Sequence, residues 1–252
     1  MNFGGLQQTS LLDYPDTISA IVWTVGCNFR CPFCYNPQLV HKTSDLLAEE
    51  EILSFLEKRK GLLEGLSISG GEPLLHEDVV EFIQKVKKLG YLVKIDTNGT
   101  FPQRLEELIE KKLVDYIAMD VKAPKTKYKQ LSGVKTPISK IEKSIDIIKN
   151  SGVDYEFKTT FVPGLLDKED ILKIAEWLKG SNTYFLQQFK ADTHLLSSDL
   201  EKVSPYSAEY LMETFKAIKP FFKKCDIRGL LIQFIFLRKF QKDLKIILIC
   251  WV

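Results

Sequence analysis

The sequence predicts an α/β protein built around a mostly parallel β-sheet. Short runs rich in β-branched and apolar residues alternate with helical patterns, and this alternation repeats six times along the chain. Each stretch between two such runs is long enough to cross the sheet and return parallel. Polar and glycine-bearing clusters follow the runs directly, at the edge where parallel β/α folds bind ligands. The residues alone leave open whether the sheet is doubly wound or closes into a complete or partial barrel.

The six predicted strands are short and mostly apolar. The first, TISAIVWTV, is rich in β-branched residues, and the second and third run into the glycine turns SGG and DTNG. Three later runs, VDYIAMDVK, VDYEFKTTFV and TYFLQQF, have the same character. The predicted strands cover residues 17–25, 63–71, 91–99, 114–122, 153–162 and 183–189.

Six helices are predicted between and after these strands. Apolar residues recur at helical spacing, as at Val79, Ile83 and Val86, so each helix has one face to bury. Pro102, close to Thr100, suits the beginning of the next helix. The predicted helices lie near 48–60, 138–150, 167–179 and 206–219, with two more through residues 79–86 and 105–113.

Composition and charge exclude several classes of protein. The chain has 252 residues, with 35 basic and 33 acidic side chains and a net charge of +2, so it lacks the basic footprint of a nucleic-acid-binding protein. The stretch MNFGGLQQTSLLDYP has neither the basic start nor the apolar run of a signal peptide. The 5 cysteines do not form the even, dispersed set of a secreted disulfide scaffold. We therefore expect a reducing, cytoplasmic location.

Three cysteines lie together in one predicted loop. Cys27, Cys31 and Cys34 form the pattern C-x₃-C-x₂-C, and thiolates at this density usually bind a soft metal. A structural zinc site would need a fourth ligand, and only His41 is near in sequence. A 4Fe–4S cluster on three cysteines would leave one iron without a protein ligand, and an open coordination site is typical of catalytic metal centres. The pattern favours such a cluster and leaves zinc as an alternative.

This pattern, with Phe33 before the last cysteine, resembles the signature of the radical S-adenosylmethionine (SAM) superfamily. The resemblance implies that SAM binds the open iron. It also implies that an electron from the cluster cleaves SAM to methionine and a 5′-deoxyadenosyl radical. Gly70, Gly71 and Glu72 of SGGEP resemble the motif that meets the amino group of SAM. Glycines let backbone carbonyls approach a ligand and a glutamate can pair with an ammonium, although the same residues suit a tight turn before a helix.

Further motifs narrow the resemblance. LLDYP, CPFCYNP, GGEP, DTNG and MDVKAP are similar to motifs of the anaerobic ribonucleoside-triphosphate reductase activating proteins and of the pyruvate formate-lyase activating enzymes. This similarity covers roughly residues 4–229. One departure is Tyr35, where many relatives have histidine; a tyrosine there can still stack or hydrogen-bond near a cluster.

The same similarity extends the candidate SAM site. It implies that Asp96, Thr97, Asp120 and Lys122 contact SAM, together with Phe33, and that a monovalent cation can sit near Asp96 and Asp120. A cation or Lys122 would relieve the repulsion between two aspartates and the SAM carboxylate. The plainer interpretations are a turn for Asp96 and a surface position for Lys122. Lys158, on a later strand, is a weaker candidate for the same cavity.

The similarity also implies a fold and its limits. It predicts a parallel (β/α)6 partial TIM-type barrel over residues 1–229, open on one side so that a peptide loop can enter. Residues 230–252 are predicted to be an apolar and basic tail of unknown role. Its two apolar bursts are separated by RKFQKDLK, and neither reaches the ~18 residues of a membrane span, so membrane insertion is not expected.

The function expected from this similarity is that of a glycyl-radical activase, which removes a hydrogen atom from a backbone glycine of a large partner enzyme. The favoured partner is the anaerobic ribonucleotide reductase, with flavodoxin or ferredoxin as electron donor because the chain has no second cluster motif. The alternatives are activation of pyruvate formate-lyase or another glycyl-radical enzyme, or chemistry on a small molecule. From a different class, the chain could be a non-catalytic iron–sulfur or zinc-binding protein.

Overall fold

One nine-stranded sheet organises residues 1–230, the part of the chain that the computed structural model describes. The strand order is β3-β1-β2-β4-β5-β6-β7-β8-β9, in which neighbours from β2 onward are parallel and β1 is antiparallel to β2 and β3. The strands are β1 Asn2–Ser10, β2 Ser19–Thr24, β3 Leu47–Ala48, β4 Gly65–Gly70, β5 Leu92–Thr97, β6 Tyr116–Asp120, β7 Asp154–Phe161, β8 Thr183–Gln188 and β9 Lys224–Arg228.

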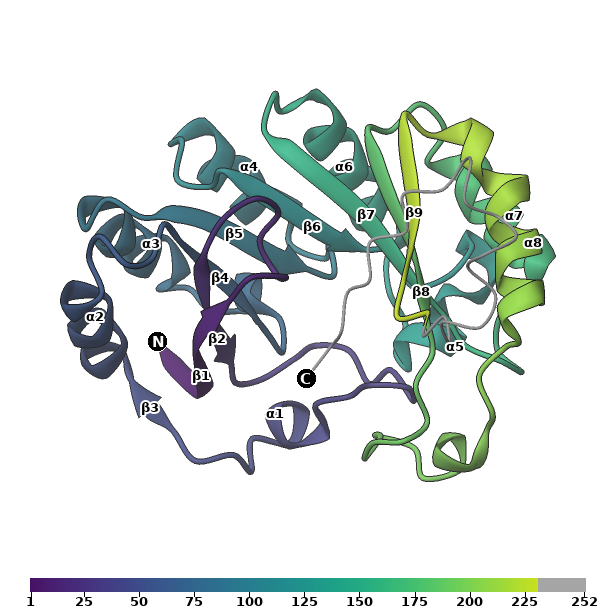
Figure 1. Cartoon of the computed structure of the whole chain (residues 1–252), viewed down its shortest axis with the longest axis horizontal. Coiled ribbons are helices and arrows are strands. Elements are labelled where there is room, and N and C mark those ends of the chain that lie inside the picture. The colour runs from purple at the N-terminus through teal and green to yellow at the C-terminus, as the bar shows by residue number, and fades with distance from the viewer. Residues whose placement is uncertain (231–252) are drawn as a thin grey trace, which may run out of the picture.

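The longer helices follow the outer side of the curved sheet (Figure 1). The α-helices are α1 Pro37–His41, α2 Glu49–Lys58, α3 Val79–Lys88, α4 Pro102–Glu110, α5 Tyr128–Ser132, α6 Ile138–Asn150, α7 Lys168–Trp177 and α8 Ala208–Ile218. Short 3-10 turns are η1 Pro73–Leu75, η2 Lys125–Lys127, η3 Leu200–Lys202 and η4 Lys219–Phe221. Helix α3 buries the predicted face of Val79, Ile83 and Val86 against the sheet. Asp167 begins α7 with a reciprocal capping box to Asp170.

The predicted α/β partial barrel is confirmed. All six predicted strands are present as β2 and β4 to β8, and β3 and β9 lie at the two ends of the strand order without pairing with each other, so the barrel is not closed. The sheet also contains β1, β3 and the seventh parallel strand β9, which the sequence did not predict. β9 reads KCDIR, whose alternating charges do not look like a buried strand.

The carboxyl ends of the parallel strands meet at one edge, and the predicted motifs leave from this edge. The cysteine loop follows β2, SGGEP ends β4, DTNG ends β5 and MDVKAP ends β6. Within residues 1–230, no helix is long and apolar enough to cross a membrane. The predicted tail falls outside the described residues from position 231 onward.

Candidate functional site

The cysteine loop, residues 26–36, is fastened by segments far away in the sequence. The backbone N–H of Arg30 donates to the carbonyl of Ser132, at the end of α5, at 2.8 Å. The N–H of Ser197, in the loop after β8, donates to the carbonyl of Pro32 at 2.9 Å. Figure 1 shows this loop running from β2 to the region of α5 before it turns back to α1. Two distant parts of the barrel therefore hold the loop.

Two glycines bring the cysteine loop against the turn after β4. The N–H of Gly71 donates to the carbonyl of Thr24 at 2.9 Å, and the N–H of Glu72 donates to the carbonyl of Gly26 at 2.8 Å. A Cβ added at Gly71 would overlap the carbonyl of Gly26, and Gly70 has a positive φ of 113° packed on Thr24. Only glycine fits this close approach. The backbone of the GGE sequence therefore holds the start of the cysteine loop in place by hydrogen bonds.

The three predicted metal ligands lie close enough to interact electrostatically. Cys31 is buried, and Cys27 and Cys34 are half-buried. Burial raises the pKa of Cys27 to about 11 and that of Cys31 to about 12, and the neighbouring thiols add to both shifts. The Lys122 ammonium lowers the pKa of all three thiols and lies 5.9 Å from the ring centroid of buried Phe33. The cysteines, Phe33 and Lys122 therefore border the same space.

This donor set fits a soft metal cluster. A buried thiol is costly to ionise in apolar surroundings, and a metal that replaces its proton removes that cost. Within residues 1–230, no three His, Cys, Asp or Glu side chains converge as they would around a single metal ion. His41 is exposed at the end of α1. The buried and half-buried thiols are therefore compatible with the predicted cluster.

Glu72 makes several hydrogen bonds within the chain. Its carboxylate has no exposed surface and accepts from the N–H of Leu74 at 3.0 Å, the hydroxyl of Thr97 at 2.7 Å and the N–H of Asn98 at 2.7 Å. Burial raises the pKa of Glu72 to about 7, although these bonds lower it. Glu72 therefore joins the turns after β4 and β5, and its contact with the amino group of SAM stays a prediction.

Asn98 extends this network to the cysteine loop. Its side-chain amide donates to Oδ1 of Asn28 at 2.9 Å, and the amide of Asn28 donates to the hydroxyl of Thr100 at 2.9 Å. The N–H of Thr100 in turn donates to Oδ1 of Asn98 at 3.0 Å. The DTNG turn is therefore bonded both to Glu72 and to the loop that carries the cysteines.

Asp96 and Asp120 each carry an ion pair inside the barrel. Asp96 binds the ammonium groups of Lys94 at 2.7 Å and Lys158 at 2.6 Å, and Asp120 lies 3.3 Å from Lys122. Burial alone would raise the pKa of Asp96, but the two lysines hold it well below the usual range. Burial would likewise lower the pKa of Lys122, and Asp120 and Cys31 raise it instead. Lys158, the weaker candidate, thus lies beside Asp96.

A further buried ion pair lies on the same inner face. Arg228 of β9 binds both oxygens of Glu156 at 2.5 and 2.7 Å, and its guanidinium carbon lies 3.5 Å from the ring centroid of Phe185. The hydroxyl of Tyr116 donates to the same carboxylate at 2.9 Å. The sequence did not lead us to Lys94, Glu156 or Arg228. A signal existed, because charged residues recur at every second position of β5, β7 and β9.

The predicted site residues form two connected groups. One group borders the cysteine loop and the inner face of the barrel: Cys27, Cys31, Cys34, Phe33, Asp96, Asp120 and Lys122. The other holds the loops together: Gly70, Gly71, Glu72 and Thr97. Tyr35 also has a structural contact, since its ring stacks on Phe189 and its hydroxyl accepts from the N–H of Lys190 at 2.9 Å.

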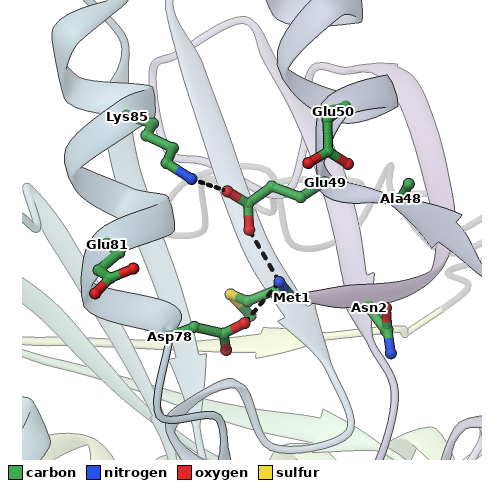
Figure 2. A pocket seen from close by; sticks show the side chains of 8 residues that line it. All are labelled: Met1, Asn2, Ala48, Glu49, Glu50, Asp78, Glu81 and Lys85. Carbon is green, nitrogen blue, oxygen red and sulfur yellow. Dashed lines mark hydrogen bonds and ion pairs between the residues drawn. The ribbon is translucent and has the colours of Figure 1, made fainter.

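A surface pocket lies apart from this site (Figure 2). The amino group of Met1 pairs there with Glu49 at 2.9 Å and Asp78 at 2.7 Å, and Lys85 binds Glu49 at 2.6 Å. None of the predicted site residues lines this pocket.

Comparison with known proteins decides the family. The family profile described as the radical SAM superfamily matches residues 21–178. The chain belongs to the radical SAM superfamily. This confirms the predicted resemblance, and the superfamily implies a 4Fe–4S cluster and SAM as its cofactors.

Curated relatives narrow the comparison within the radical SAM superfamily. The chain is 40% identical over 191 residues to a candidate glycyl-radical enzyme activating enzyme of Methanocaldococcus jannaschii. The aligned region covers 74% of this chain and 79% of the relative. It is 30% identical over 185 residues to the pyruvate formate-lyase-activating enzyme of Clostridium pasteurianum, covering 69% of this chain and 74% of that one. The chain is thus a radical SAM enzyme related to activating enzymes.

Solved structures of radical SAM proteins share the fold. SuiB of Streptococcus suis bound to SAM superposes with a TM-score of 0.64 at 15% identity, over 83% of this chain and 49% of SuiB. This chain therefore spans about half the length of SuiB. A domain of the pyruvate-formate lyase-activating enzyme of Bacteroides vulgatus gives a TM-score of 0.53 at 18% identity, over 66% of this chain and 99% of that domain. At these identities the likeness concerns the fold alone.

Proposed function

We propose that this radical SAM protein is a glycyl-radical activase whose cluster is held by Cys27, Cys31 and Cys34. The observation that carries this proposal is the set of three buried or half-buried thiols in the loop after β2, at the carboxyl edge of the sheet. The other cysteine among residues 1–230 is Cys225, on the distant strand β9. A three-thiol set leaves one iron of a 4Fe–4S cluster open to SAM.

In this proposal, the side chains of the protein bind and orient the cluster and SAM. A 4Fe–4S cluster held there would supply an electron, taken from an external donor, for the cleavage of SAM to methionine and a 5′-deoxyadenosyl radical, and this radical would take a hydrogen atom from a partner glycine Cα. Phe33 and Lys122 border the thiols and supply an aromatic face and a positive charge. Glu72 and Asn98 keep three loops in register through their hydrogen bonds. A fixed site that excludes water suits radical chemistry, which needs no protein acid or base.

We propose the anaerobic ribonucleotide reductase as the partner, with flavodoxin or ferredoxin as electron donor. The order of LLDYP, CPFCYNP, GGEP, DTNG and MDVKAP supports this choice. A second candidate partner is pyruvate formate-lyase, which is favoured by the relative from Clostridium pasteurianum. The open side of the barrel, between β3 and β9, is compatible with entry of a peptide loop in either case.

The proposal is tested by transfer of the radical. Protein reconstituted anaerobically with iron and sulfide is mixed with SAM, dithionite and each candidate partner, and the glycyl doublet is sought by electron paramagnetic resonance. We expect a doublet on one partner, its loss with Cys34→Ala and its retention with Cys225→Ala. Formation of 5′-deoxyadenosine without a doublet on either partner would instead favour a small-molecule substrate.

A further inference from the structure

Asp96 is a nearly buried carboxylate whose two oxygens each bind a lysine of the chain. Lys94 binds Oδ2 at 2.7 Å and Lys158 binds Oδ1 at 2.6 Å. The side chains of all three residues are at most 13% exposed. Ion pairs this well shielded from water keep much of their electrostatic strength.

Strand geometry places these groups together. Lys94 and Asp96 are two residues apart on β5 and therefore point to the same face. On the next strand, β6, the residue opposite Asp96 is Ala118, whose single methyl group leaves room above it. Lys158 of β7 lies opposite Asp120 and reaches past β6 to Asp96. The small side chain between two long ones makes this triple contact possible.

The charges at this position do not suit a monovalent cation. Three ammonium groups, those of Lys94, Lys122 and Lys158, face the two carboxylates of Asp96 and Asp120. The nearby carboxylate of Glu156 is balanced by its ion pair with Arg228. An added Na⁺ or K⁺ would meet the repulsion of ammonium groups that already occupy both oxygens of Asp96. The expected cation near Asp96 and Asp120 therefore does not fit the residues present.

We propose that Lys94 and Lys158 take the place of a monovalent cation beside the SAM site, so that this chain works without Na⁺ or K⁺. This inference rests on the proposed function in one respect, because Asp96 and Asp120 are taken to border bound SAM. The ammonium groups supply, as part of the fold, the positive charge that an ion would otherwise bring from solution.

The first test compares salts on the unaltered protein. SAM affinity and the rate of 5′-deoxyadenosine formation are measured in KCl, NaCl and choline chloride at equal ionic strength, together with the thermal unfolding midpoint of the protein without cluster or SAM. We expect all three quantities to be independent of the salt, with affinity and rate within about twofold. A loss of affinity or rate of about fivefold or more in choline chloride would overturn the proposal.

The second test uses variants that should depend on a monovalent cation. Lys94→Ala combined with Lys158→Ala frees both oxygens of Asp96 and leaves one ammonium group facing two carboxylates. We expect KCl to raise the unfolding midpoint of this variant above its value in choline chloride, and to restore SAM affinity by about fivefold or more. Lys158→Ala alone should show the same direction and replaces the double variant if that chain does not fold.

The control is Lys87→Ala, which removes a lysine bound to Asp115 at 2.7 Å away from the site. The unfolding midpoint and SAM affinity of this variant should be the same in KCl and in choline chloride. Lysine-to-alanine variants of the site that folded yet showed no preference for KCl would overturn the proposal. A protein that made no 5′-deoxyadenosine in any salt would contradict the proposed function, and the unfolding midpoints without cofactor would still decide between lysines and a cation.

Discussion

The hydroxyl of Thr97 donates a 2.7 Å hydrogen bond to Oε1 of Glu72, a carboxylate with no exposed surface. The two motifs that the sequence suggested as separate SAM contacts, GGE and DTNG, are thus bonded to each other. Through Asn98 the same network reaches Asn28, next to Cys27. The residues around the cysteines therefore form one connected support for the loop.

Glu72 should make the stability of the cofactor-free protein depend on pH. Its pKa is raised by burial from 4.5 to about 7, so between these values the folded chain keeps a proton that the unfolded chain has lost. The contribution of Glu72 to the unfolding free energy is therefore fully present below pH 4.5 and is lost as the pH rises through about 7. Relative to Glu72→Gln, which does not titrate, the parent should lose about 3 kcal/mol of unfolding free energy.

This difference is measured by urea unfolding at about pH 5 and about pH 8. The role given to burial would be contradicted if the difference in unfolding free energy between the parent and Glu72→Gln were the same at both pH values. It would also be contradicted if the parent gained stability relative to Glu72→Gln at the higher pH.

Gly71→Ala should displace the cysteine loop. The new Cβ would overlap the carbonyl of Gly26, which is backbone and cannot turn aside. Overpacking of this kind costs on the order of 1–3 kcal/mol. We expect a lower unfolding free energy and less iron bound after reconstitution. Gly5→Ala is the control, because the nearest contact of its new Cβ would be the side chain of Trp23 at 3.1 Å. Equal loss of iron in both variants would contradict the role of the close approach between Gly71 and Gly26.

Tyr35→Phe should loosen the segment after β8 and leave the rest of the fold in place. The change removes the hydroxyl that accepts from the N–H of Lys190 but keeps the ring on Phe189. We expect a loss of about 0.5–1.5 kcal/mol and faster amide hydrogen exchange at Lys190. Tyr91→Phe removes a hydroxyl bonded to the carbonyl of Leu56 and should leave Lys190 exchange unchanged. Unaltered exchange in Tyr35→Phe would refute the contact.

The buried pair of Arg228 and Glu156 should be sensitive to loss of one partner. Arg228→Met leaves a carboxylate inside the barrel without its main counter-charge, which costs about 3–5 kcal/mol. The exposed pair of Lys111 and Glu107 serves as control, and Lys111→Met should change stability by less than about 1 kcal/mol. Chemical unfolding measures both, and similar effects in the two variants would show that burial does not strengthen the first pair.

Periodicity and turn residues were sufficient to predict six strands, their helices and the edge where the motifs meet. The assignment of Cys27, Cys31 and Cys34 as cluster ligands came from their spacing together with the family resemblance, and it stays a prediction. What could not be predicted depends on contacts between distant segments. β9 was missed because Arg228 looks exposed until Glu156 is placed beside it. Lys94 was missed for the same reason, and the burial of Glu72 follows from its three donors, which only the fold brings together.

The central claim is that three thiolates hold a cluster with one iron open to SAM. The most direct measurement is 5′-deoxyadenosine formed by anaerobically reconstituted protein with SAM and dithionite, comparing the parent with Cys31→Ala and Cys225→Ala. We predict 5′-deoxyadenosine from the parent and from Cys225→Ala, and none from Cys31→Ala. A parent that carries its full complement of iron and sulfide yet forms no 5′-deoxyadenosine would contradict the account, as would undiminished formation by Cys31→Ala.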